Sequence, residues 1–333
     1  RIVLALTCLT LALHWVQKYP CQDGGWRNNS QYTQFCYTDT LALYFHERLN
    51  EGAVPYRDHK VEYPVVTGYL MGAIGLPVYH LGKNNPNINE AQWFYNLNAL
   101  VLLSLAVATA AIILALRRRR PWDAALFALS PALLLTATVN WDFLPIGFAA
   151  FGLYAWAKRR PVLAGLLLGL GAAAKLWPLF LLGPILLLAL RTGRLRAALS
   201  AFGTAAVTIV AVNLPVALPY TENWSEFFRL NSTRAIDWGT SWYIGRYLDG
   251  KWHTGIPGDR GPFQWLSANI PTLNYLSYAL ILAAFLAIAV LALRAPRRPR
   301  LAALAFLAVA AFLIFSKVWS QQFVLWLLPL AVL

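Results

Sequence analysis

Long apolar runs recur along the whole chain, and they constrain its fold more than any other feature. The runs are continuous, rich in leucine and alanine, and close to the ~20 residues that a helix needs to cross a bilayer. They lack the strict alternation of apolar and polar residues that is typical of membrane β-barrels. With 59% hydrophobic and 13% charged residues, the chain is also too apolar for a soluble domain. The sequence therefore predicts an all-α polytopic integral membrane protein.

About ten stretches are expected to span the membrane, within a single module that covers residues 1–333. Several of them are short, so we expect tilted or partial crossings. The first run ends at Lys18-Tyr19-Pro20 without a small-residue cleavage site, so a cleavable signal peptide is not expected. The expected spans are residues 2–16, 93–116, 122–139, 142–157, 161–174, 177–190, 195–213, 271–294, 300–315 and 319–333.

The basic residues predict how these spans are oriented. The formal net charge is +14, and most of the excess lies in short links between apolar runs, as expected of cytoplasmic loops. With Arg1, these links hold 15 Lys and Arg but one acid, Asp123. This distribution indicates membrane topology, and a nucleic-acid partner is not expected. The clusters are Arg117–Arg120, Lys158–Arg160, Arg191 with Arg194 and Arg196, and Arg294 with Arg297, Arg298 and Arg300.

Residues 62–82 decide whether all four clusters share one side. They are apolar enough to span, and a crossing there would move every later cluster to the opposite face. Pro64, Gly68, Gly72, Gly75 and Pro77 weaken a straight spanning helix, so we predict a juxtamembrane or re-entrant segment. The two long loops, residues 17–92 and 214–270, then lie outside the cytoplasm and form the active face of a multi-pass plasma-membrane protein.

The cysteines allow two readings of the first outer loop. Cys21 and Cys36 either form a disulfide or remain two free thiols. Cys8, in the first span, is expected to be a small core residue.

Ionisable residues gather on the predicted outer face. Each could merely snorkel or shape a turn, but such groups are costly near a membrane and are often functional. The first loop holds three carboxylates, Asp39, Asp58 and Glu62. The others are Asp142 in the turn Asn140-Trp141-Asp142, Lys175 and Lys317 between short spans, and Arg234, Asp237, Arg246 and His253 in the second long loop.

The first outer loop resembles that of the GT-C membrane glycosyltransferases in Asp39 to Tyr44, Gly52 to Tyr56, and Glu62-Tyr63-Pro64. Within that superfamily the chain is similar to glycosyltransferase family 87, the polyprenyl-phosphate-mannose-dependent mannosyltransferases of actinobacteria. One departure is Val65, where many relatives carry a second proline. Further similar stretches follow in order: Asn140-Trp141-Asp142, Gly165 to Pro178, Asn231 to Tyr243, and Ser316 to Trp326.

The resemblance implies a GT-C-like helix bundle with juxtamembrane helices in the first outer loop. It implies an inverting transfer of a sugar, usually mannose, from a polyprenyl-phosphate donor lipid to a glycolipid or glycan acceptor outside the cytoplasm. In the family the base is the Asp shortly after the first span, here Asp39. Asp58 is the second choice, although it could simply form a turn.

The residues suit this chemistry on their own. An acceptor hydroxyl needs a carboxylate base, and a departing lipid phosphate needs nearby cations but no proton donor. Outer-loop tryptophans could stack on sugars or lie in the interfacial belt. The residues expected to bind substrate are Asp58, Glu62, Tyr63, Asp142, Lys175, Arg234, Asp237, Trp238, His253, Lys317 and Gln321.

Other functions remain open at this point. A transporter or flippase for a lipid-linked or small polar substrate would explain charges within the membrane but not the two long outer loops. A scaffold or lipid-binding subunit would tolerate loss of Asp39. There is no Walker loop and no zinc-like histidine spacing, so we expect neither a metal nor a cofactor. The acceptor could be a phosphatidylinositol mannoside, a lipoglycan, another glycan or a protein, and the sugar could be arabinofuranose.

Overall fold

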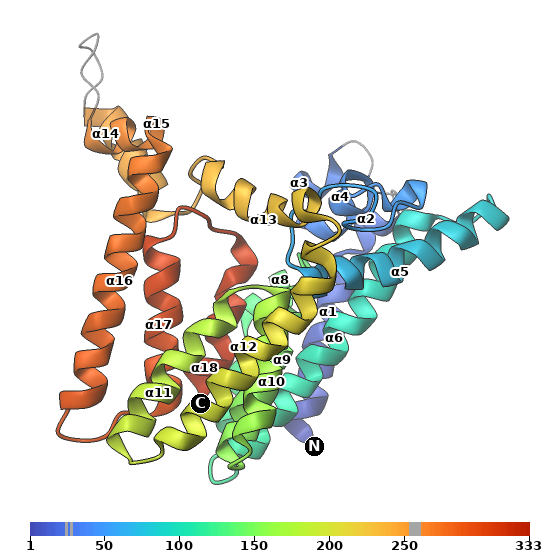
Figure 1. The fold of residues 1–333 in the computed structure, drawn as a ribbon. Helices are drawn as coiled ribbons and strands as arrows, with labels where there is room; N and C mark the ends of the chain where they lie inside the picture. The colour runs from blue at the N-terminus through green and yellow to red at the C-terminus, as the bar shows by residue number, and fades with distance from the viewer. Residues whose placement is uncertain (24–25, 27–28, 253–260) are drawn as a thin grey trace.

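The computed structural model describes residues 1–23, 26, 29–252 and 261–333, and within them it is helical without strands (Figure 1). The α-helices are α1 (Ile2–Gln17), α2 (Tyr19–Asp23), α3 (Ser30–Thr33), α4 (Asp39–His46), α5 (Val65–Asn84), α6 (Glu90–Leu116), α7 (Ala125–Ala128), α8 (Pro131–Thr136), α9 (Phe143–Ala157), α10 (Pro161–Ala174), α11 (Leu182–Arg191), α12 (Leu195–Ala217), α13 (Thr221–Thr233), α14 (Ser241–Trp252), α15 (Pro262–Ala268), α16 (Ile270–Arg294), α17 (Leu301–Phe315) and α18 (Val324–Val332). Short 3₁₀ helices are η1 (Leu49–Glu51), η2 (Pro121–Ala124), η3 (Trp177–Leu181) and η4 (Gln321–Phe323).

Five of the described helices are long and apolar enough to cross a membrane, so the prediction of ten spans is not confirmed. Most other predicted spans are shorter apolar helices of 10–17 residues, such as Pro161–Ala174 and Leu301–Phe315. The five long candidates are Ile2–Gln22, Val65–Asn84, Glu90–Leu116, Leu195–Ala217 and Ile270–Arg294.

The stretch expected to span at 122–139 is not one continuous helix. The chain there divides into η2, α7 and α8. Pro131 begins α8, and Ser130 before it has an extended backbone and accepts a hydrogen bond from the Ala132 N–H. Proline cannot donate to a preceding turn and disfavours helical geometry in the residue before it, so the apolar run breaks at this point.

Helices α10 and α12 pack closely against each other. A Cβ atom added at Gly165 would lie 2.2 Å from the Ala201 carbonyl oxygen, and one added at Gly169 would lie 2.8 Å from that of Ala205. Small residues let two helix backbones approach in this way. The packing fixes the end of α10, where Lys175 follows.

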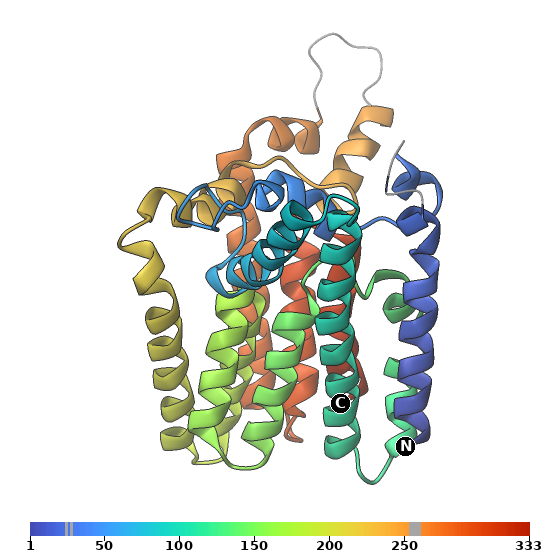
Figure 2. The ribbon, with the colours of Figure 1, turned by 90° about the vertical axis from the view of Figure 1, so that its right-hand side faces the viewer.

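Helix α5 lies obliquely across the upper end of the bundle, whereas α1, α6 and α12 run along its length (Figures 1 and 2). Its first turn is tied to the bundle because Thr67 Oγ1 donates to the Ala174 carbonyl at 2.8 Å. Its length and hydropathy would still suit a span. That residues 62–82 do not cross the bilayer therefore stays a prediction, which this orientation supports.

The two ends of the bundle differ in chemistry. The links α6–η2, α9–α10, α11–α12 and α16–α17, which carry the four basic clusters, lie together at the lower end in Figure 1. We call this the basic end. Helices α4 and α13 lie at the opposite, upper end, with the segment that precedes α5. The clusters thus share one end, as the charge pattern predicts.

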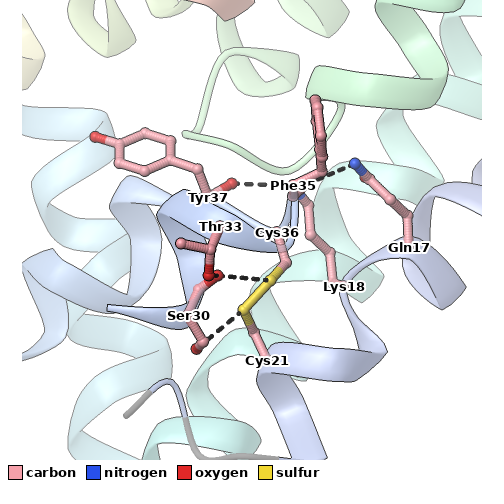
Figure 3. Close-up of a disulfide and its surroundings, with 8 residues drawn as sticks. All are labelled: Gln17, Lys18, Cys21, Ser30, Thr33, Phe35, Cys36 and Tyr37. Atoms are coloured by element: carbon pink, nitrogen blue, oxygen red, sulfur yellow. Dashed lines mark hydrogen bonds between the residues drawn. A yellow bond between two sulfur atoms is a disulfide. The ribbon is translucent and has the colours of Figure 1, made fainter. Parts of the chain in front are cut away.

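A disulfide joins Cys21 and Cys36, whose Cα atoms are 6.1 Å apart, so the first of the two cysteine readings is observed (Figure 3). The segment that follows is tied to the end of α1, because Lys18 Nζ donates to the Tyr37 carbonyl at 2.9 Å. These links hold the chain just before Asp39. Cys8 is exposed on α1, so its expected place in the core is wrong.

Candidate active site

A cavity of about 750 Å³ opens at the upper end, among α4, α13, the segment before α5, and the segment between α17 and α18. Its wall holds carboxylates, cations and aromatic rings from distant parts of the chain. Several of the residues singled out from sequence meet here: Asp39, Glu62, Tyr63, Lys175, Arg234, Asp237 and Trp238.

Asp39 is the first residue of α4, and its backbone is fixed by the segment that precedes α9. The Asp39 N–H donates to the Val139 carbonyl at 2.7 Å. Thr38 Oγ1 donates to the Thr138 carbonyl at 3.0 Å. Among the described residues, no side chain caps the N-terminus of α4. The Asp39 carboxylate is free to face the cavity.

Two polar side chains orient that carboxylate. Oδ1 accepts a hydrogen bond from the Tyr37 hydroxyl, and Oδ2 accepts one from Asn140 Nδ2 at 3.1 Å. Asn140 Nδ2 also donates to the Tyr63 hydroxyl at 2.6 Å. Burial and the charge of Asp39 raise the pKa of Tyr37 above its usual value. Tyr37 therefore stays a protonated donor at neutral pH.

Glu62 is a second carboxylate in the cavity wall, and it is half-buried. Burial raises the pKa of Glu62, as does the nearby charge of Glu47. Glu47 is itself buried, accepts a hydrogen bond from the Glu62 N–H at 3.3 Å and lies 2.9 Å from His59 Nε2. Glu62 is thus positioned to contact a substrate hydroxyl and is easier to protonate than an exposed Glu.

Asp58 lies outside the cavity lining and is exposed. Its carboxylate accepts from the Val54 N–H and from Arg57 Nε, both at 2.8 Å. These hydrogen bonds lower the pKa of Asp58 to about 2. The geometry is that of a turn-forming residue.

Lys175 reaches the cavity wall while paired with Asp142. Lys175 Nζ lies 2.8 Å from Asp142 Oδ1, and it also lies 4.8 Å from the centre of the Phe323 ring. Asp142 is buried, does not line the cavity, and accepts a second hydrogen bond from Trp326 Nε1 at 2.6 Å. Its Oδ2 has no hydrogen-bond partner among the described residues. Asp142 therefore positions Lys175.

Arg234 and Asp237 form a second pair in the wall, 3.0 Å apart. Asp237 is anchored to the segment after α17, since its N–H donates to the Lys317 carbonyl at 2.9 Å and its Oδ2 accepts from the Trp319 N–H at 3.2 Å. Trp238 beside it is 81% exposed and can be reached by a ligand.

Lys317 is a buried cation beside the cavity. It is 5% exposed, and its Nζ donates to the Ser232 carbonyl at 3.1 Å. Within the described ranges, no carboxylate lies within 4.0 Å of it. Burial and the charge of Arg234 lower the pKa of Lys317. Lys317 lines an adjoining cavity of about 300 Å³, which shares Lys175, Phe227 and Asn231 with the first.

Gln321, like Asp58, Asp142 and Lys317, is not among the residues that line the cavity. Gln321 is exposed, and its neighbour Gln322 lines the wall instead. His253 lies outside the described residues. Sequence reasoning did not assign Tyr37, His46, Asn140 or Gln322 to the site, although all four line it. Asn140 and Gln322 lie within the sequence stretches that resemble the family, and this resemblance is the signal that could have assigned them to the site. Among the described residues, no three His, Cys, Asp or Glu side chains are grouped to hold a metal ion.

The chain has no match among the curated proteins. A family model does match residues 91–320, and its description is glycosyltransferase family 87. Asp39, Glu62 and Tyr63 precede the matched region, whereas Asn140, Lys175, Arg234 and Lys317 lie within it. Because the match covers more than half of a chain with several membrane-length apolar helices, the protein belongs to glycosyltransferase family 87 and is a membrane glycosyltransferase.

Proposed function

We propose that the protein transfers mannose from a polyprenyl-phosphate donor lipid to a glycolipid or glycan acceptor, with inversion at the anomeric carbon. One observation carries this proposal: the Asp39 carboxylate and the cations Lys175 and Arg234 line the same cavity at one end of a membrane bundle. The identification of the sugar as mannose rests on the family resemblance.

The proposed reaction is a direct displacement. The acceptor oxygen attacks the anomeric carbon, and its proton passes to the Asp39 carboxylate as the new C–O bond forms. The bond from the anomeric carbon to the phosphate oxygen breaks, and its electron pair leaves with the polyprenyl phosphate. Attack opposite the leaving group inverts the configuration. Tyr37 and Asn140 orient the carboxylate for this proton transfer.

The leaving phosphate needs positive charge nearby. Lys175, Arg234 and Lys317 differ in how much of their charge is already neutralised by a carboxylate. Asp142 already pairs with Lys175, and Asp237 with Arg234. The described hydrogen-bond partner of Lys317 is a backbone carbonyl and not a carboxylate, so more of its charge is available to an anion than for the two paired cations. We place the donor phosphate where the two cavities meet, between Lys175 and Lys317.

The adjoining cavity suits the prenyl chain of the donor. Its wall is mostly apolar and includes Phe227, Phe228, Ile281 and Phe312 from helices α13, α16 and α17. An isoprenoid chain lying there would bring its phosphate to Lys317. The sugar would then enter the larger cavity, where Trp238 and Trp319 could stack on its faces.

We propose that this cavity faces away from the cytoplasm in the plasma membrane. The four basic links lie at the opposite end of the bundle, and short basic links are typical of the cytoplasmic face. Cysteine-accessibility labelling tests this topology: a label at Lys83 to Glu90 should be reached from the same side as one at Asp58. Labelling of 83–90 from the cytoplasm would contradict it.

The function is tested by incubating purified protein with labelled polyprenyl-phosphate-mannose and a lipid extract. We expect a labelled product and released polyprenyl phosphate. A parallel incubation with polyprenyl-phosphate-arabinofuranose tests the other sugar, and product from that donor alone would overturn the assignment of mannose. A flippase would instead move the donor across vesicles and leave it intact.

A further inference from the structure

A separate cavity, of about 490 Å³, lies at the basic end of the bundle, away from the candidate active site. Its wall is formed by the ends of α6, α9 and α11 and by the start of α17. These four elements converge at the lower end of Figure 1, where the basic links gather. Four arginines line it: Arg117, Arg194, Arg298 and Arg300.

The four guanidinium groups leave a net positive charge in this wall. Arg117 pairs with Asp123, and Arg194 lies 5.6 Å from the centre of the Trp156 ring. Among the described residues, neither Arg298 nor Arg300 has a carboxylate within 4.0 Å. Both are exposed, so a ligand can reach their charges.

The start of α17 adds to this positive potential. The helix has 15 residues, and none of the described side chains caps its N-terminus. Leu301 and Ala302, its first two residues, line the cavity. The first N–H groups of a helix lack partners within the helix and attract anions.

Apart from Thr192, the rest of the wall is apolar, and this favours a lipid over a free anion as the ligand. Leu116, Leu153 and Leu188 line it, together with the Trp156 ring. A free phosphate would contact the arginines but leave these side chains unused. The cavity also lies where the apolar helices end, the level at which lipid headgroups lie in a bilayer.

We propose that this cavity binds the phosphate-bearing headgroup of an anionic membrane lipid. Arg298 and Arg300 would donate to the phosphate oxygens, since a guanidinium matches phosphate with two parallel hydrogen bonds. The leucines and Trp156 would contact the upper acyl chains. Basic pockets between membrane helices bind lipid headgroups in this way. The site lies at the opposite end of the bundle from the proposed sugar transfer.

The test is thermal unfolding of the purified full chain in micelles titrated with phosphatidylglycerol, with phosphatidylcholine, or with inorganic phosphate. Phosphatidylglycerol should raise the unfolding midpoint. The Arg298→Gln/Arg300→Gln variant should need roughly 30-fold more of that lipid for half the shift, because two cations near the phosphate are lost. The matched control, Arg118→Gln/Arg119→Gln, removes two exposed arginines of the same end that do not line the cavity. It should titrate as the wild type does.

Two results would overturn the proposal. An equal change in both double variants would indicate general surface charge. A full shift with inorganic phosphate, and nothing further with phosphatidylglycerol, would indicate a free-anion site. If Arg298→Gln/Arg300→Gln fails to fold, the single variants Arg298→Gln and Arg118→Gln are compared in the same titration, and equal midpoint shifts in those two would again reject the lipid site.

Discussion

Asn140 Nδ2 donates a hydrogen bond to Asp39 Oδ2 at 3.1 Å, across 101 positions of sequence. The contact joins the first turn of α4 to the turn that precedes α9. The same amide group donates to the Tyr63 hydroxyl at 2.6 Å. One asparagine thus fixes the proposed base relative to an aromatic residue of the cavity wall, and this linkage makes the proposed roles testable one residue at a time.

The Asp39→Asn variant should lose sugar transfer by a factor of roughly 10²–10⁴, the usual effect of removing a general base. Asn is close to isosteric but cannot accept the hydroxyl proton as a carboxylate does. Transfer of labelled mannose by the purified variant is the measurement. Asp58→Asn, in the exposed turn, is the matched control and should retain near wild-type activity. Near wild-type transfer by Asp39→Asn would make Glu62, another carboxylate in the wall, the next candidate base.

The Asn140→Ala variant should slow transfer by roughly 10–100-fold, the range expected when a hydrogen bond to a charged group is lost. The loss should fall on kcat more than on the donor KM, because Asn140 orients the base and not the phosphate. Steady-state kinetics with the labelled donor separate the two. Asn269→Ala is the control, since that amide donates to the Trp265 carbonyl one helical turn away. A change confined to KM would contradict the orienting role.

The membrane class and much of the site wall could be predicted from the sequence. Burying a charged residue against lipid is energetically costly. Residues such as Asp39, Lys175 and Arg234 are therefore expected to line a polar cavity. Tyr37, Asn140 and Gln322 carry no charge and are ordinary in loops. Packing alone distinguishes them, and no local pattern reports a contact across 101 residues.

The errors in the sequence prediction have similar causes. Residues 122–139 read as one apolar run because hydropathy does not register the break that Pro131 makes after Ser130. The sequence does not show that Cys8 is exposed, because a small residue in a span can face either a neighbouring helix or lipid, and composition does not separate the two. The pairing of Lys175 with Asp142 depends on where two helix ends meet. A local sequence pattern does not predict such a contact.

The Lys175→Met variant should be markedly less stable than wild type as well as weaker in donor binding. It leaves the buried Asp142 carboxylate without its cation, and breaking a buried pair in this way costs about 3–5 kcal/mol. The double variant Lys175→Met/Asp142→Asn should recover much of the unfolding midpoint but not the donor affinity. Lys60→Met, which removes an exposed pair with Glu222, should change stability little. Equal midpoints for the single and double Lys175 variants would argue against the pairing.

Donor affinity should fall as the pH rises through the alkaline range, and Lys317 should be the cause. Burial and the charge of Arg234 lower the pKa of Lys317 from its ordinary value of 10.5. The folded protein therefore loses this proton at a lower pH than an unfolded chain would. Stability should therefore rise with pH in this range. The free-energy cost of the buried charge is present at neutral pH, and it is relieved as the pH rises from the folded-state pKa toward 10.5. Donor binding has the opposite sign, because the lipid phosphate needs the charged form.

We expect a donor-lipid titration from neutral to alkaline pH to separate this effect from general denaturation. The proteins compared are the wild type, Lys317→Arg and Lys317→Met. Wild-type affinity should decline below pH 10.5, while Lys317→Arg should show a flatter profile, since a guanidinium keeps its proton throughout. Lys317→Met should bind the donor roughly 10-fold or more weakly even at neutral pH, because a hydrogen-bonded charge is lost. Arg has a wider head group in this buried position, so its absolute affinity can drop as well; the slope against pH is the diagnostic quantity. Parallel slopes for wild type and Lys317→Arg would assign the alkaline loss to another group and would remove Lys317 from the phosphate site.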